Sequence, residues 1–160
     1  MSKEEARPSK ILIVADGTQA DKSVTKLASK IALRNKGDIF AIYVIEVKRT
    51  LPLETEIETE IQKGENVLEQ VEKSAKIFGH SITETALLQT RDKGSAIVEE
   101  SRARSVDLII LGINYEKPFG EFSLGTAIPY VLKHAVCSVI LVREPMPREQ
   151  VINVNKEDMS

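Results

Sequence analysis

Short runs of apolar residues recur along the 160-residue chain and predict the strands of a buried sheet. The runs at Ile11–Ala15 and Leu108–Leu111 are too short for helices and contain no polar residue. Such runs are typical of strands covered on both faces, as in a parallel sheet. We expect five strands, at Ile11–Ala15, Ile39–Val47, Ile82–Thr90, Leu108–Leu111 and Ser138–Val142. The third mixes threonine with apolar residues, so we expect it to be less buried than its neighbours.

Between these runs, apolar residues recur at steps of three and four, which is the spacing of an amphipathic helix. Thr18 and Asp21 have the spacing of a capping box before the first helix, and Asp92 or Ser95 can cap the third. Gly37 and Gly79 mark the ends of the first two helices. The predicted apolar faces are Val24, Leu27, Ala28, Ile31 and Ala32; Ile57 to Phe78; Ala96 and Ile97; and Ile128, Val131, Leu132 and Ala135.

Strands that alternate with helices predict a single doubly wound α/β domain at residues 10–143, with a five-stranded parallel sheet and helices on both faces. The first strand, helix and strand form a βαβ unit whose crossover should be right-handed. Residues 1–9 and 144–160 are rich in charge and proline, and we expect them to form flexible tails. Within the second tail, Val151–Val154 is β-prone and could pair with an exposed sheet edge.

Charge and composition narrow the class of protein. The net charge of −2 gives no reason to expect nucleic acid or an anionic membrane as a partner. No apolar run approaches the length of a membrane span, and the polar N-terminus lacks the apolar region of a secretory signal. The single cysteine, Cys137, excludes an internal disulfide. We therefore expect a cytoplasmic protein.

The stretch from Asp107 to Thr126 is the candidate binding region, because it reads as strand, glycine loop and helix. Ligands of open parallel sheets sit beyond the carboxyl ends of the strands, where helix N-termini offer free N–H groups. Gly112 permits close approach of a ligand or of the chain, and Gly125–Thr126 opens the helix. Asp16 ends the first strand, which can lie beside the fourth. Its carboxylate could accept hydrogen bonds from ribose, or it could brace the first loop.

Other chemistry finds little support in the sequence. Gly120–Thr126 has the glycine spacing of a P-loop but lacks its lysine, and the dinucleotide fingerprint is absent. His80 and His134 lack metal-ligand companions, so we expect no metal site; His134 suits a helix C-terminus. Cys137 is most simply a small buried hydrophobe. No nucleophile has the setting of a hydrolase serine. We therefore do not expect an enzyme.

The chain resembles the universal stress protein family from about Lys10 to Arg143. The resemblance rests on Ile-Leu-Ile-Val-Ala-Asp-Gly-Thr at 11–18, Asp-Leu-Ile-Ile-Leu-Gly at 107–112, Leu-Gly-Thr at 124–126, and the segment Val-Leu-Lys-His-Ala-Val-Cys-Ser-Val-Ile-Leu-Val-Arg at 131–143. Together, in this order and spacing, these motifs are specific. The resemblance implies a doubly wound domain that dimerises through its last strand. One branch of the family binds ATP, and another does not.

The resemblance also implies a set of nucleotide-site residues. The ATP-binding branch carries Gly-x₂-Gly-x₉-Gly-[Ser/Thr], and the middle glycine is replaced here by Tyr115. Glu116 and Glu121 add negative charge to this loop, opposed only by Lys117. The residues that match the family's site are Asp16 at the ribose, Ala15 and Val44 at the adenine, the motif residues Gly112, Gly125 and Thr126, and the flanking Leu111 and Ala127.

Two hypotheses of different classes follow. The first is a regulatory protein that binds an adenine nucleotide, ATP or AMP, as a regulatory ligand, with or without slow hydrolysis of it. The second is a nucleotide-free dimeric interaction protein whose phosphate site has degenerated. Asp16 and the glycines favour the first, whereas Tyr115 and the two glutamates favour the second. An enzyme that uses the same cleft on another nucleotide is a third alternative. Both leading hypotheses include a homodimer through the last strand, with Val139 and Leu141 at the contact.

Overall fold

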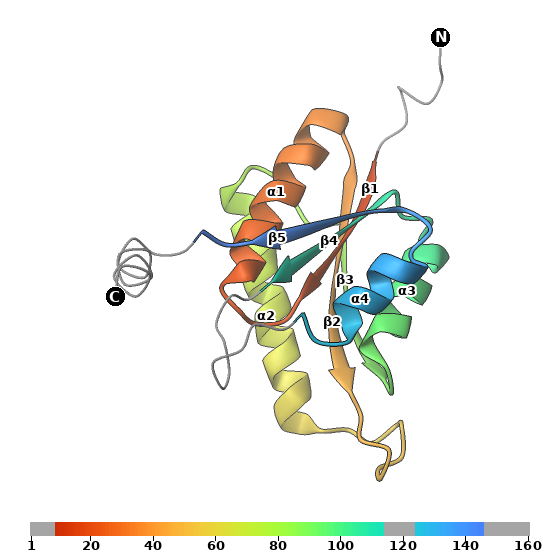
Figure 1. Cartoon of the computed structure of the whole chain (residues 1–160). Coiled ribbons are helices and arrows are strands. Elements are labelled where there is room, and N and C mark those ends of the chain that lie inside the picture. The colour runs from red at the N-terminus through yellow and green to blue at the C-terminus, as the bar shows by residue number, and fades with distance from the viewer. Residues whose placement is uncertain (1–8, 114–123, 146–160) are drawn as a thin grey trace, which may run out of the picture.

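The computed structural model describes residues 9–113 and 124–145, and in them the chain forms the predicted doubly wound α/β fold (Figure 1). The described part of the sheet has five strands, all parallel, in the order β3-β2-β1-β4-β5. These strands are β1 (Lys10–Ala15), β2 (Asp38–Glu46), β3 (Glu84–Thr90), β4 (Leu108–Ile113) and β5 (Ser138–Arg143). The fold class predicted from the sequence is therefore confirmed. The predicted tails fall almost wholly outside the described residues.

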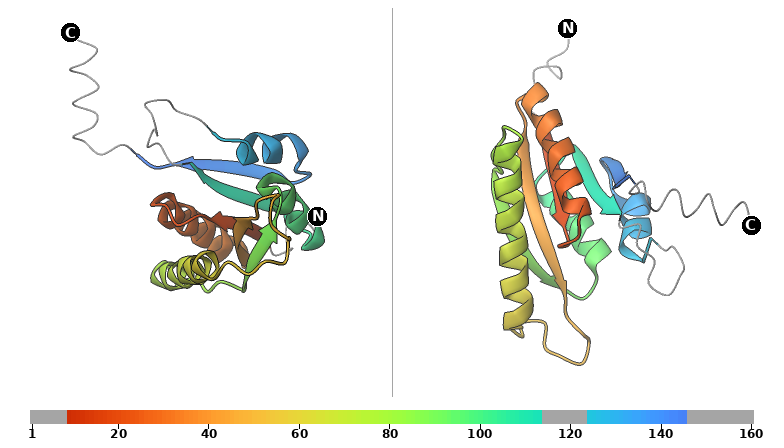
Figure 2. Two further views of the ribbon diagram at one scale, coloured as in Figure 1. Left: turned by 90° about the horizontal axis from the view of Figure 1, so that it is seen from below. Right: turned by 90° about the vertical axis from the view of Figure 1, so that its left-hand side faces the viewer.

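Helices cover both faces of this sheet (Figure 2). They are α1 (Ala20–Asn35), α2 (Glu58–Ile77), α3 (Lys93–Ala103) and α4 (Ala127–His134). The first two helices pack against each other on one face, and the last two pack against each other on the opposite face. No helix in the described ranges is long and apolar enough to cross a membrane.

The core lies in two layers, one on each side of the sheet. Residues of β1 alternate between them, since Ile11 and Ile13 face α1 and α2, whereas Leu12 and Val14 face α3 and α4. All four are at most 6% exposed. This two-sided burial explains why the strand sequence has no polar alternation. The edge strand β3 is only half-buried, as its threonines predicted.

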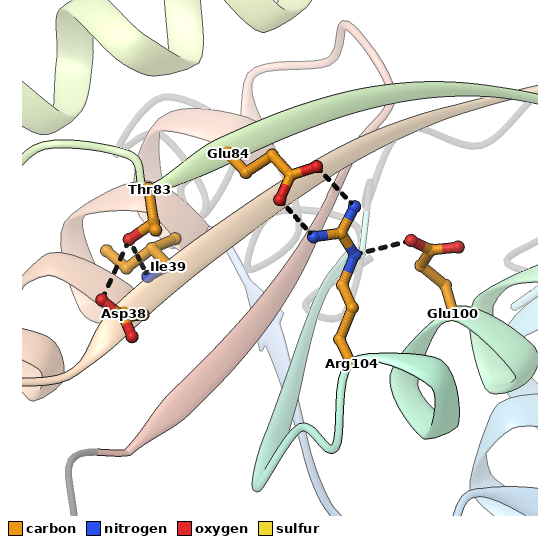
Figure 3. A network of polar contacts seen from close by, with 6 residues as sticks. All are labelled: Asp38, Ile39, Thr83, Glu84, Glu100 and Arg104. Carbon is orange, nitrogen blue, oxygen red and sulfur yellow. Dashed lines mark hydrogen bonds and ion pairs between the residues drawn. The ribbon is translucent and has the colours of Figure 1, made fainter.

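An ion-pair network ties β3 to α3 at the amino-terminal edge of the sheet (Figure 3). Arg104 donates to both oxygens of Glu84 at 2.9 and 3.2 Å and to Glu100 at 2.6 Å. Nearby, the Thr83 hydroxyl joins the Asp38 carboxylate to the N–H of Ile39. These contacts lie at the opposite ends of the strands from the candidate site, and we assign them a structural role.

Candidate functional site

A pocket of about 400 Å³ lies at the carboxyl ends of β1 and β4, beside the N-terminus of α4. The two strands are neighbours in the sheet, with Val14 paired to Leu111, as the sequence predicted. Strand order reverses at this point, so the chain leaves β1 and β4 toward opposite faces and the loops diverge. Six of the eight predicted site residues line the pocket: Asp16, Leu111, Gly112, Gly125, Thr126 and Ala127.

Ala15 and Val44 are the two predicted site residues outside the pocket lining. Ala15 is 3% exposed and packs in the core layer beneath α1 and α2. Val44 packs against the core layer beneath α3 and α4. The alternation of side chains along β1 turns Val14 toward the pocket and Ala15 away from it. Their predicted role at an adenine ring stays a prediction.

The turn between β1 and α1 holds Asp16 at the pocket. Oδ1 of Asp16 accepts hydrogen bonds from the Thr18 N–H at 2.9 Å and from the Thr18 hydroxyl at 2.6 Å. The bracing role considered from the sequence is therefore present. The same carboxylate also lines the pocket, so bracing and ligand contact are compatible.

The capping box predicted at Thr18 and Asp21 is wrong. Gln19 is the N-cap of α1 and makes no side-chain capping bond. The Thr18 hydroxyl is engaged by Asp16, and the Asp21 carboxylate accepts the N–H groups of Asp16 and Gly17 instead of that of Thr18. The predicted cap of α3 is correct, because Asp92 accepts from the N–H groups of Gly94 and Ser95.

Gly112 is required by packing within the chain. A Cβ at this position would lie 2.8 Å from the Cβ of Ala20 and 3.1 Å from Cγ2 of Val24. Both neighbours belong to α1, so the absent side chain lets this helix approach the end of β4. Of the two explanations that the sequence left open, close approach of the chain is the one that the structure supports.

Gly125 has a different reason to be glycine. Its φ is +70°, in the left-handed region that side chains disfavour, and a Cβ there would have no neighbour within 4 Å. The residue turns the chain into α4, whose N-cap is Thr126. The first N–H groups of any helix lack an intrahelical acceptor, and the first two residues of α4, Ala127 and Ile128, line the pocket.

Two charged residues of the pocket were missed by the sequence reasoning. Glu46 is the last residue of β2, and Lys93 is the first residue of α3. Capping by Asp92 places the start of α3, and hence Lys93, at the carboxyl edge of the sheet. That signal was available in the sequence. From the sequence, Lys117 was the only positive charge expected near the phosphate loop, and it lies outside the described residues. Lys93 supplies a positive charge at the pocket.

Several predicted features of the phosphate loop cannot be placed, because residues 114–123 are outside the described ranges. They include Tyr115, Glu116, Gly120 and Glu121.

Other candidate chemistry has ordinary structural partners. Both ring nitrogens of His80 lie within hydrogen-bonding distance of carbonyl oxygens, those of Ser81 and Gly37. The ring of His134 packs against that of Tyr130, with 4.2 Å between the ring centroids. Burial raises the pKa of the Cys137 thiol, which makes the thiolate scarce. Among the described residues, no group of histidine, cysteine and carboxylate side chains could hold a metal ion.

A second pocket, of about 500 Å³, lies between α1 and α2. Val67 and Val71 form apolar parts of its wall, and Asp21, Thr25 and Gln70 contribute polar groups. It borders the same β1–α1 turn as the first pocket.

The fold and the first pocket define a class: parallel α/β proteins with a ligand site at the reversal of strand order. Within that class, the chain belongs to the universal stress protein family, whose profile matches residues 8–143. The family predicted from the sequence motifs is thus confirmed.

Individual relatives support the same assignment. The chain is 30% identical over 142 residues to a universal stress protein of Methanocaldococcus jannaschii, a match that covers 85% of this chain and 82% of the relative. A universal stress protein of Archaeoglobus fulgidus has a similar structure, with a TM-score of 0.69 at 18% identity over 84% of this chain and 98% of that one. The structure of a universal stress protein from the same organism in complex with dAMP gives a TM-score of 0.66 at 14% identity, over 85% of this chain and 98% of that one. A family member from Arabidopsis thaliana with AMP bound gives 0.58 at 17% identity, over 90% and 99%.

Proposed function

We propose that this protein binds an adenine nucleotide, ATP or AMP, as a regulatory ligand in the pocket at the carboxyl ends of β1 and β4, and that it is not an enzyme. The observation that carries the proposal is the meeting of Asp16 with Gly125, Thr126 and Ala127 in one pocket. By the resemblance, they match the family's ribose aspartate, the end of its glycine motif and the residue after that motif, and they come from distant parts of the chain. The volume of about 400 Å³ is within the usual range for small-molecule sites.

The chemistry of each pocket residue suits it to a different part of the nucleotide. Asp16 accepts hydrogen bonds from ribose hydroxyls, since a carboxylate has about four acceptor positions and Thr18 takes two of those on Oδ1. The N-terminus of α4 offers N–H groups and a favourable dipole to a phosphate. Lys93 adds a positive charge to the lining of the same pocket. The relatives from A. fulgidus and A. thaliana, whose structures contain dAMP and AMP, support an adenine nucleotide as the ligand class.

A nucleotide-free interaction protein is the second candidate, and one observation favours it. The described pocket wall carries two carboxylates, Asp16 and Glu46, against the single ammonium group of Lys93. Carboxylates repel phosphates, and the repulsion grows with each phosphate added. On this alternative the domain functions through its surfaces alone.

A titration of the purified protein distinguishes the two candidates. The nucleotide released by heat denaturation is identified first, and the stripped protein is then titrated calorimetrically with adenosine, AMP and ATP. Saturable binding of at least one of the three supports the proposal. If none binds and no nucleotide is released from the purified protein, the interaction-protein candidate replaces it. Binding of adenosine with weaker binding of ATP would mean that the carboxylates limit the phosphate side.

We propose in addition that the protein is a homodimer through β5. Among the residues that the structure describes, β5 pairs only with β4, and its half-buried residues Val139, Ile140, Leu141 and Val142 continue both core layers to the edge. An apolar strand with a free edge is a template for pairing with a second chain. The single cysteine, in a chain without a disulfide, supports a cytoplasmic location.

A further inference from the structure

The carboxylate of Asp21 holds the backbone of the β1–α1 turn. Its Oδ1 accepts the N–H of Asp16 at 3.0 Å, and its Oδ2 accepts the N–H of Gly17 at 2.8 Å. Gly17 has a φ of +85°, so the turn passes through a conformation that depends on glycine. A single side chain from the first turn of α1 therefore fixes two consecutive amides of the loop that presents Asp16.

The two aspartates face different pockets. Asp16 lines the pocket at the carboxyl ends of the strands, whereas Asp21 lines the pocket between α1 and α2. The β1–α1 turn that joins them contributes residues to the lining of both cavities. Water and protons can thus reach Asp21 from the α1–α2 side while a nucleotide occupies the other pocket.

We propose that Asp21 is a positioning residue for Asp16: its ionised form holds Asp16 in the orientation that accepts ribose, and protonation of Asp21 weakens nucleotide binding. The inference rests on the proposed function and names a regulation of that same site.

The chemistry of the carboxyl group gives the reason. An ionised carboxylate accepts hydrogen bonds on both oxygens, and both are in use here. After protonation, one oxygen carries a hydrogen and becomes a weaker acceptor for the backbone N–H that it binds. The new O–H is a donor, and the carboxylate of Asp16 is an acceptor that interacts with the Asp21 side chain. Protonated Asp21 would therefore loosen the turn and compete with ribose for Asp16.

The surroundings of Asp21 raise the pKa of its carboxyl group into the neutral range. Burial raises the pKa of Asp21 from 3.8 to about 7, and the charge of Asp16 adds to the rise, against the opposing effect of the two backbone N–H groups. The other charged groups near it are Lys22 and Glu144, which line the same pocket, and Lys63, whose Cε lies close to Gly17. The facing residues of α2 in that pocket, such as Asn66 and Gln70, are neutral.

The first test needs no nucleotide. Backbone amide resonances of Asp16 and Gly17 are followed by NMR between pH 5 and pH 9 in the wild-type protein and in Asp21→Asn. We expect both amides of the wild type to titrate with a midpoint in the neutral range, and the titration to be lost in the variant. Asp107→Asn is the matched control, because Asp107 also accepts a backbone N–H, that of Lys10, at the far edge of the sheet. Wild-type amides that do not move between pH 5 and pH 9 would overturn the inference.

The second test measures AMP affinity at pH 6 and pH 8 in the same three proteins. The ratio of wild-type to Asp21→Asn affinity is used at each pH, because ionisation of AMP itself cancels in the ratio. If only the ionised form of Asp21 is competent, this ratio rises by about tenfold from pH 6 to pH 8. The ratio of wild type to Asp107→Asn should stay constant.

The outcomes separate this inference from the proposed function. If the amides titrate but the ratio of wild-type to Asp21→Asn affinity is the same at pH 6 and pH 8, the positioning role is refuted and nucleotide binding is not. Absence of AMP, ATP and adenosine binding at every pH would refute the proposed function, and the inference with it, even if the amides titrate. Should Asp21→Asn fail to fold, Asp21→Ser, which also lacks an ionisable side chain, replaces it in both tests.

Discussion

At the scale of single residues, Asp16 has a structural role in the β1–α1 turn and, under the proposed function, a binding role as well. Asp16→Ala removes the acceptor for two bonds from Thr18 and, under the proposed function, the acceptor for ribose. Loss of a hydrogen bond to a charged group costs about 1.5–3 kcal/mol, which corresponds to a loss of about 10- to 150-fold in nucleotide affinity. Calorimetric titration with AMP checks the prediction.

A matched variant separates the two roles of Asp16. Thr18→Val removes the hydroxyl bond to Asp16 but leaves the carboxylate in the pocket. We expect it to lower the melting temperature slightly and to leave AMP affinity within a few-fold of wild type. If Asp16→Ala changes only the melting temperature, Asp16 is a brace and does not contact the ligand.

Gly112 gives a second prediction at this scale, and it concerns stability. Gly112→Ala places a methyl group 2.8 Å from the Cβ of Ala20, so α1 must shift away from β4. Overpacking of this kind costs about 1–3 kcal/mol in the free energy of unfolding, measurable by denaturant titration. In an Ala20→Gly background the nearest obstacle is gone, and the added cost of Gly112→Ala should be smaller. Equal costs in both backgrounds would contradict the packing explanation.

At the scale of elements, the sequence predicted the strands and helices well because burial decides them. The apolar runs at Ile11–Ala15 and Leu108–Leu111 differ from the observed strands by no more than two residues at either end. The predicted cap of α1 failed for a local reason. Thr18, Asp16 and Asp21 can bond to one another in several combinations, and spacing alone does not select among them. Lys93 was missed although the predicted cap at Asp92 marked the start of α3, because the pocket that this start borders depends on where α3 packs.

The edge strand β5 is the element through which we expect the protein to dimerise. Ile140→Pro removes a backbone N–H from the middle of this strand, and proline is poorly tolerated within a paired ladder. We expect the variant to sediment as a monomer at concentrations where the wild type is a dimer.

A proline in the other edge strand is the control for this prediction. Ala86→Pro makes the same change in the middle of β3, at the opposite end of the sheet. It should retain the dimer. Circular dichroism establishes that both variants are folded at the temperature of sedimentation, and a dimer in folded Ile140→Pro would exclude the β5 interface.

At the scale of the whole molecule, two carboxyl groups should shape the dependence of stability on pH in opposite directions. The pKa of Asp21 is raised on folding, so its charged form disfavours the folded state, and stability falls as pH rises from about 4 to about 7. The Arg104 guanidinium lowers the pKa of Glu84, so the stability from this pair is lost as pH falls below 4.5. We therefore expect maximal stability on the acid side of neutrality.

Denaturant unfolding at a series of pH values checks this curve. Asp21→Asn should flatten the decline between pH 4 and pH 7, and Glu84→Gln should flatten the decline at lower pH. A wild-type stability that increases steadily from pH 4 to pH 8, with the same slope in Asp21→Asn, would contradict the raised pKa of Asp21.

The central position of β1 has a consequence for the order in which the protein becomes functional during synthesis. β1 pairs with β2, which follows it closely, and with β4, which follows much later; the Lys10–Asp107 bond beside that pairing spans 97 residues. Contacts of such separation close slowly, since the entropy of a long loop opposes them. A nascent chain on the ribosome can therefore assemble β1, α1 and β2 before the glycine-containing segments that line the pocket with Asp16 have folded. The pocket exists only after α4 has emerged, so under the proposed function a nucleotide would stabilise finished chains and leave truncated ones exposed to proteolysis.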